Sequence, residues 1–168
     1  YFQLTERFRH TTLVDYLDPG NQQVNGFLDY NVDTLNAMTG FQTGGDLWVS
    51  VIPGLRAGGS ITGGIYGNHA KQSTRIDAMS FAGVPITETS TSGVATLMGQ
   101  ANFGVSWRVN YHWTARVGYE LLYIEGVALA PNNFNTQVPF GGSPRDVRID
   151  TDGNLFYTGG TASLEFTW

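Results

Sequence analysis

The chain of 168 residues contains no cysteine, so it can form neither a disulfide framework nor a cysteine-based metal site. It has no run of about 18 apolar residues, which excludes a membrane-spanning helix. Lys and Arg number only 9 against 14 Asp and Glu, and this acidic balance argues against nucleic acid as a partner. The sequence opens at Tyr1 without an initiating Met or a signal peptide, and we expect it to be processed or cut from a longer chain.

Glycine (22 residues) and aromatic residues (13%) are frequent, which favours strands with tight turns over helices. Residues 95–109 show the clearest pattern, because every odd position is apolar or glycine and most of the others are polar. Side chains alternate across a strand, so this segment has one apolar and one polar face. Ordinary strands run about 5–6 residues, and a much longer amphipathic strand is typical of a membrane-crossing barrel.

The same alternation predicts six long strands. Three residues, 52–54, join the second to the third, with Gly54 supplying the positive φ of the turn. A three-residue turn at 110–112 joins the fourth to the fifth and places Ser106 opposite Arg116, and Asn102 opposite Glu120. The six predicted strands are 1–9, 34–51, 55–74, 94–109, 113–125 and 154–168.

The other connections, 10–33, 75–93 and 126–153, are long. Short turns at one end and long loops at the other are typical of outer-membrane barrels. The first loop contains the apolar stretches 13–17 and 24–32, which form either a hairpin that extends outward or two further wall strands. The sequence leaves both readings open.

Seven charged residues share the polar side of the predicted strands. In a closed barrel they would line the lumen, as an ion-pair network that fills it or as the wall of a water channel. They are Arg7, Asp46, Arg56, Arg108, Arg116, Glu120 and Glu165. Five aromatic residues on the other side predict an aromatic girdle at the membrane interfaces, the alternative being core aromatics of a soluble barrel or sandwich. They are Trp107, Trp113, Tyr119, Tyr123 and Trp168.

No motif predicts catalysis or a cofactor. No nucleophile, histidine and acid occur at a recognisable spacing, and the three histidines are expected to be solvated, so we expect a protein that is not an enzyme. Asp150, Asp152 and Gly153 are similar to the start of a calcium loop, but the distal acidic ligands are missing. A plain Asp-Gly turn is therefore favoured over a metal site.

The last residues, Thr161 to Trp168, alternate up to an aromatic end. This segment resembles the C-terminal strand signal by which the barrel-assembly machinery recognises bacterial outer-membrane proteins. We therefore expect that machinery and the lipid bilayer of a bacterial outer membrane to be partners of the chain.

Four internal strings and Trp168 occur in a familiar order: Tyr1–Glu6, Gly40–Asp46, Gly63–Gln72 and Gly118–Pro131. Together they resemble the porin-like outer-membrane β-barrel family found mainly in planctomycetes, over nearly the whole chain. The resemblance implies an outer-membrane barrel of ill-defined substrate, without catalytic residues to transfer. Family members carry additional strands before the first string, which implies the C-terminal part of a larger barrel of about ten strands or more. The missing wall would come from preceding sequence or from another chain.

We thus predict one all-β domain, an antiparallel up-and-down transmembrane β-barrel. If 168 residues are complete, the six strands and the 13–32 hairpin give eight, the smallest common closed barrel. The expected function is a passive diffusion pore or a structural envelope component. One alternative is an adhesion or assembly protein that uses its long loops to contact a neighbouring envelope protein or further copies of itself. Another is a soluble lipocalin-like barrel with its apolar face inside, because alternation does not say which face is inside.

Overall fold

The computed structural model describes the chain except residues 18–19, 21, 79–84 and 138–144. The described residues form six β-strands and no helix. They therefore contain no candidate membrane-spanning helix. The strands are β1 (Phe2–Leu17), β2 (Gln23–Ile52), β3 (Leu55–Asp77), β4 (Ile86–Arg108), β5 (Trp113–Val127) and β6 (Gly153–Phe166). The predicted all-β class is confirmed, and each of the six predicted segments corresponds to one of these strands; the total strand number of the predicted barrel stays a prediction.

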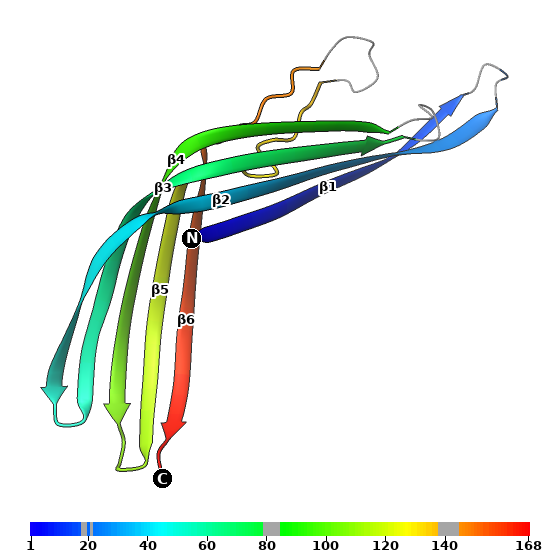
Figure 1. The fold of residues 1–168 in the computed structure, drawn as a ribbon. Helices are drawn as coiled ribbons and strands as arrows, with labels where there is room; N and C mark the ends of the chain where they lie inside the picture. Colours follow the sequence, from blue (N-terminus) through cyan, green and yellow to red (C-terminus); the bar gives the residue numbers. More distant parts are fainter. Residues whose placement is uncertain (18–19, 21, 79–84, 138–144) are drawn as a thin grey trace. The chain divides into compact units, whose positions relative to one another are not determined.

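The strands form one sheet in which neighbours in sequence are neighbours in space (Figure 1). The order β1-β2-β3-β4-β5-β6 is an antiparallel up-and-down arrangement, as predicted. Within the described ranges, β1 and β6 are its two edge strands. Closure into a barrel stays a prediction.

The first hairpin answers the question that the sequence left open for residues 10–33. β1 pairs with β2 continuously, from Phe2 opposite Met38 to Leu17 opposite Gln23. This segment is therefore a hairpin that lengthens two strands, and it adds no further pair to the wall. β3 and β4 are also longer than their alternation alone predicted, because paired backbone continues into segments with a mixed pattern.

The β4–β5 hairpin has the predicted register. Ser106 faces Arg116 and Asn102 faces Glu120. At the turn, the side-chain oxygen of Asn110 accepts hydrogen bonds from the backbone N–H groups of residues 112 and 113, both at 2.9 Å. The β2–β3 turn has Gly54 at φ +85°, the conformation for which glycine was predicted.

The chain divides into two compact units. Unit 1 comprises Tyr1–Met38, Asn68–Val94 and Val127–Gly153, and unit 2 comprises Thr39–Gly67, Ala95–Gly126 and Asn154–Trp168. In unit 1, the described residues between β5 and β6, 128–137 and 145–152, lie against one face of the strands and close a small core. We call them the covering segment. Tyr30, Val32, Ile76 and Ala130 form this core, and Phe134 adds ring contacts to Tyr30 at 4.5 Å.

Gly126 ends the β5 part of unit 2 in a left-handed backbone conformation, with φ +85°. A Cβ at this position would lie 2.6 Å from the carbonyl oxygen of Ala95. Because a side chain is strained there by both its φ and its surroundings, glycine is required for this path of the backbone. The Gly126 carbonyl accepts a 2.6 Å hydrogen bond from the buried hydroxyl of Thr96.

Candidate functional site

The strands of unit 2 present two chemically different faces. The cross-strand pairs Phe103–Tyr119 and Val105–Val117 belong to one of them. In unit 2, a row of exposed apolar side chains extends over five strands. They are Phe41, Leu47, Val49, Val51, Ile61, Ile65, Leu97, Phe103, Val105, Val117, Leu164 and Phe166. A lipocalin-like barrel would pack its apolar face into a dry interior. Four residues of this face are exposed instead: Leu97, Phe103, Val117 and Phe166.

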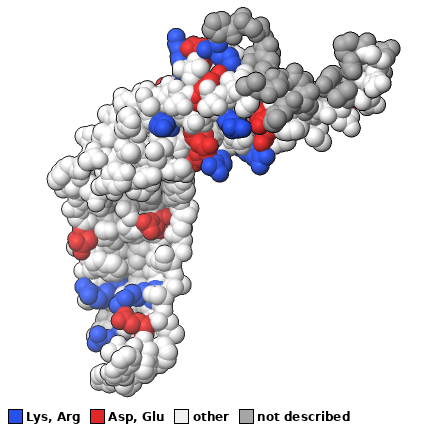
Figure 2. Space-filling model, turned by 45° about the vertical axis from the view of Figure 1, so that its right-hand side comes forward, with Lys and Arg blue, Asp and Glu red and all other residues white. Residues whose placement is uncertain are grey.

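Charged residues make up only 14% of the chain, and on the face drawn in Figure 2 they occur in separate groups with uncharged surface between them. Six of the seven predicted lumen residues lie in unit 2, and all six are exposed: Asp46, Arg56, Arg108, Arg116, Glu120 and Glu165. The pairs Ser106–Arg116 and Asn102–Glu120 show that polar residues of β4 and β5 share a face, as the alternation predicts.

Two contacts tie charged residues of this polar face together. Arg116 forms an ion pair of 2.7 Å with Glu165, which joins β5 to β6. Glu120 accepts a 2.6 Å hydrogen bond from the side-chain amide of Gln100. Arg56, Arg108 and Arg116 line one common hollow near the short turns.

The five residues of the predicted girdle are all exposed, with none in a core: Trp107, Trp113, Tyr119, Tyr123 and Trp168. Trp107 and Trp113 flank the β4–β5 turn, where an interfacial belt is expected. The ring of Trp113 contacts that of Phe166 at 4.9 Å. The backbone N–H of Thr167 donates to the His112 carbonyl at 2.8 Å, and the Thr167 carbonyl lies 3.0 Å from Nδ1 of His112. These contacts anchor Thr167 beside the turn.

Arg7 lies elsewhere, in unit 1, and its placement differs from the prediction. It forms an ion pair with Asp33, and both side chains are well exposed to solvent. Its neighbour Phe8, whose side chain is on the opposite face of β1, packs its ring against Phe134 of the covering segment. The reason is that alternation separates two faces of β1 without saying which one another segment will cover. In unit 1, the apolar face is the covered one.

Arg9 and Asp29 form a bidentate pair on the same strands as Arg7, with N–O distances of 2.6 and 2.8 Å. This hydrogen-bonded pairing with Arg9 holds the pKa of Asp29 at about 2, below its ordinary value of 3.8. A carboxylate whose pKa is lower in the folded than in the unfolded state stabilises fully above the unfolded value. That stabilisation is lost as the pH falls from about 4 to about 2.

Asp29→Asn tests this pH dependence. We expect the free energy of unfolding to differ between the wild type and the variant by a constant amount above about pH 4, and the difference to shrink toward pH 2. Urea titrations at several pH values, followed by circular dichroism, measure it. A difference that stays constant down to pH 2 would contradict the assignment.

The covering segment is held to unit 1 by a buried asparagine. The side-chain amide of Asn36 donates to the carbonyl of Ala128 and its oxygen accepts from the Ala128 N–H, both at 2.8 Å. Asn68, on the neighbouring strand, donates to the same Asn36 oxygen at 3.0 Å. Buried backbone N–H and C=O groups without hydrogen-bond partners are destabilising. The Asn36 side chain supplies both partners for Ala128, as a neighbouring strand would.

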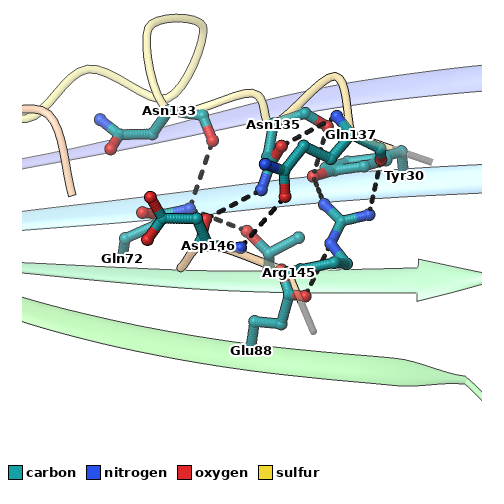
Figure 3. Close-up of polar contacts among 9 residues, drawn as sticks. Tyr30, Gln72, Glu88, Asn133, Asn135, Gln137, Arg145 and Asp146 are labelled. Carbon is teal, nitrogen blue, oxygen red and sulfur yellow. Dashed lines mark hydrogen bonds and ion pairs between the residues drawn. The ribbon is translucent and has the colours of Figure 1, made fainter. Parts of the chain in front are cut away.

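Asn133 joins the two arms of the covering segment. Its side-chain amide donates to the carbonyls of Leu129 and Asp150 at 2.8 and 2.9 Å, and its side-chain oxygen accepts from the Asp150 N–H at 2.7 Å. Gln72 of β3 donates to the Asn133 carbonyl at 3.2 Å (Figure 3). The described parts of the segment are thus joined to each other and to β3.

Arg145 is the charged anchor of this segment (Figure 3). Its Nε lies 2.8 Å from a carboxylate oxygen of Glu88 on β4, and the two side chains are only 6% and 11% exposed. The contact is an ion pair outside hydrogen-bond angles. Other nitrogens of Arg145 donate to the Tyr30 hydroxyl at 2.9 Å and to the carbonyl of Gln137 at 3.0 Å. Burial raises the pKa of Tyr30, and the neighbouring Arg145 opposes this.

The residues that hold the covering segment were not identified from the sequence: Asn36, Glu88, Asn133 and Arg145. Residues 126–153 were expected to be a long loop, and the structure shows that much of this loop packs against the sheet. One signal was present, because the apolar run 127–130 is followed by asparagines and Phe134, a composition that suits a half-buried segment. Nothing in it, however, identified Asn36 or Glu88 as partners.

The Asp150 region shows a local turn. The carboxylate of Asp150 accepts a hydrogen bond of 2.9 Å from the backbone N–H of Asp152. This is the side-chain-to-backbone bond typical of an Asx turn. Over the described ranges, no three His, Cys, Asp or Glu side chains are grouped closely enough to hold a metal ion.

Comparisons with known proteins found no matching family model, no matching curated protein and no matching solved structure. The resemblance to the planctomycete barrel family therefore stays a prediction.

Proposed function

We propose that the chain forms part of the wall of an integral outer-membrane β-barrel, and that this barrel acts as a porin-like passive diffusion channel. The observation that carries the proposal is the exposed apolar face of unit 2, opposite a face with charged residues. Soluble proteins rarely expose contiguous apolar patches larger than roughly a few hundred Å², because such surfaces associate with one another or with other apolar surfaces. In a bilayer the same face is stabilised by hydrocarbon, and the strand pairing satisfies the backbone.

The dimensions of the strands support this proposal. A tilted strand crosses a membrane with roughly 9–11 residues, and the unit 2 portions of β4 (95–108) and β5 (113–126) are longer than that. Lipid also requires that no strand edge be left open, so further strands must pair with the edges of this sheet.

The first hairpin supports a second candidate function, adhesion or assembly. β1 and β2 are paired far beyond the length that a membrane requires. Leu13 and Phe27, opposite each other near its end, are exposed large apolar side chains. Such a hairpin suits contact with a neighbouring envelope protein or a second copy of the chain.

Partitioning and permeability measurements test the channel. We expect the folded protein to enter the detergent phase, to migrate as a heat-modifiable species, and to make liposomes swell in small sugars. Heat-unfolded protein added to the same liposomes is the control. Insertion without swelling would replace the channel by the adhesion or assembly role. Full solubility in buffer would overturn the membrane proposal and leave the lipocalin-like barrel.

A further inference from the structure

Three arginines converge on a hollow of about 680 Å³ at the short-turn end of unit 2. Arg56 belongs to β3, next to its turn, whereas Arg108 and Arg116 come from β4 and β5. All three alternate with apolar neighbours, so they belong to the polar face of their strands. One third of the nine Lys and Arg residues of this acidic chain thus line a single hollow.

The positive charge of the hollow is only partly neutralised. Arg116 is paired with Glu165, but Arg56 and Arg108 form no ion pair within the described residues. No acidic residue belongs to the described lining of the hollow. Guanidinium groups remain charged at every physiological pH, so this surplus is permanent.

Hydroxyl groups stand among the arginines. Ser50, Ser106 and Thr114 line the same hollow, and the strand register places Ser106 opposite Arg116 and Thr114 opposite Arg108. Guanidinium and hydroxyl groups together supply many hydrogen-bond donors around one space. Planar guanidinium groups bind oxyanions in a bidentate manner, which gives such contacts both strength and direction.

We propose that this hollow is a binding site for a tetrahedral oxyanion, with inorganic phosphate as the simplest ligand, held by Arg56, Arg108 and Arg116. The binding rests on the hollow alone. A consequence for transport rests on the proposed function: the site would lie where a short-turn vestibule opens into the lumen, and the channel would prefer anions to cations.

Titration of the folded protein in detergent with inorganic phosphate, observed by ³¹P NMR line broadening and by calorimetry, tests the site. We expect saturable binding that weakens about tenfold or more in Arg56→Gln and in Arg108→Gln. Arg75→Gln is the matched control, because it removes the same charge from an exposed pair in unit 1. Heat-modifiable migration of each variant verifies folding.

The outcomes separate the site from the channel. No saturable binding by the folded wild type, or an equal loss in Arg75→Gln, would overturn the oxyanion site. Reversal potentials in planar bilayers under a salt gradient then report on transport, and we expect anion preference that falls in Arg56→Gln and Arg108→Gln. Phosphate binding without conductance would contradict the proposed channel while the site itself stands.

Discussion

Phe103→Lys is expected to lower the free energy of unfolding of the bilayer-inserted protein by ~2–4 kcal/mol. Phe103 is 58% exposed on the apolar face, midway along the unit 2 part of β4. In the proposed orientation its side chain meets hydrocarbon, where an ammonium group loses its hydration. Reversible urea unfolding in lipid vesicles, followed by tryptophan fluorescence, measures the effect.

Two variants make this experiment specific to the face of the strand. Gln100→Lys introduces the same charge on the polar face, where the side chain donates to Glu120, and should change stability by no more than about 0.5 kcal/mol. Phe103→Ala separates loss of the ring from gain of the charge. If Gln100→Lys is the more damaging lysine variant, the apolar face points away from lipid and the membrane proposal fails.

Glu88→Gln is expected to destabilise the covering segment of unit 1 by about 3–5 kcal/mol. The variant leaves the charge of Arg145 almost buried, and among the described residues it keeps the neutral oxygens of Tyr30 and Gln137 as partners. A buried charge that has lost its counter-ion pays its desolvation cost without compensation. Backbone amides of this segment that donate to side chains of the strands, those of Ala128 to Asn36 and of Ala130 to Glu6, should exchange with solvent at least about 100-fold faster.

The exposed pair of Arg7 and Asp33 supplies the control. Asp33→Asn breaks an ion pair with similar groups, but in water, and should cost no more than about 1 kcal/mol. Glu88→Gln combined with Arg145→Met removes both buried charges and should recover part of the lost protection. Unchanged exchange in Glu88→Gln would mean that the ion pair does not hold the segment.

Local patterns sufficed for much of the sheet. The period of two located all six strands, and a three-residue turn fixed the β4–β5 register down to Ser106 opposite Arg116. Turn chemistry likewise assigned the positive φ to Gly54. These features depend on neighbours within a few positions, and a single sequence contains that information.

The candidate site was predictable only in part. The alternation grouped the charged residues of unit 2, including the three arginines of the hollow, because strand parity fixes a face. It also grouped Arg7 with them, whereas Arg7 pairs with Asp33 on strands whose other face is covered. Which face of a strand is covered depends on a distant segment, and periodicity does not report it.

By itself, then, the sequence determined strand type, turn geometry, register and the separation of oily from polar side chains, since each follows from short-range backbone geometry and steric preference. Tertiary structure decided that the described residues after β5 lie against the strands of unit 1, where Asn36 and Ala128 meet across 92 positions of chain. It also decided that Arg145 finds Glu88 there. Such meetings require that buried polar groups find partners anywhere in the chain, and only the folded arrangement specifies which ones do.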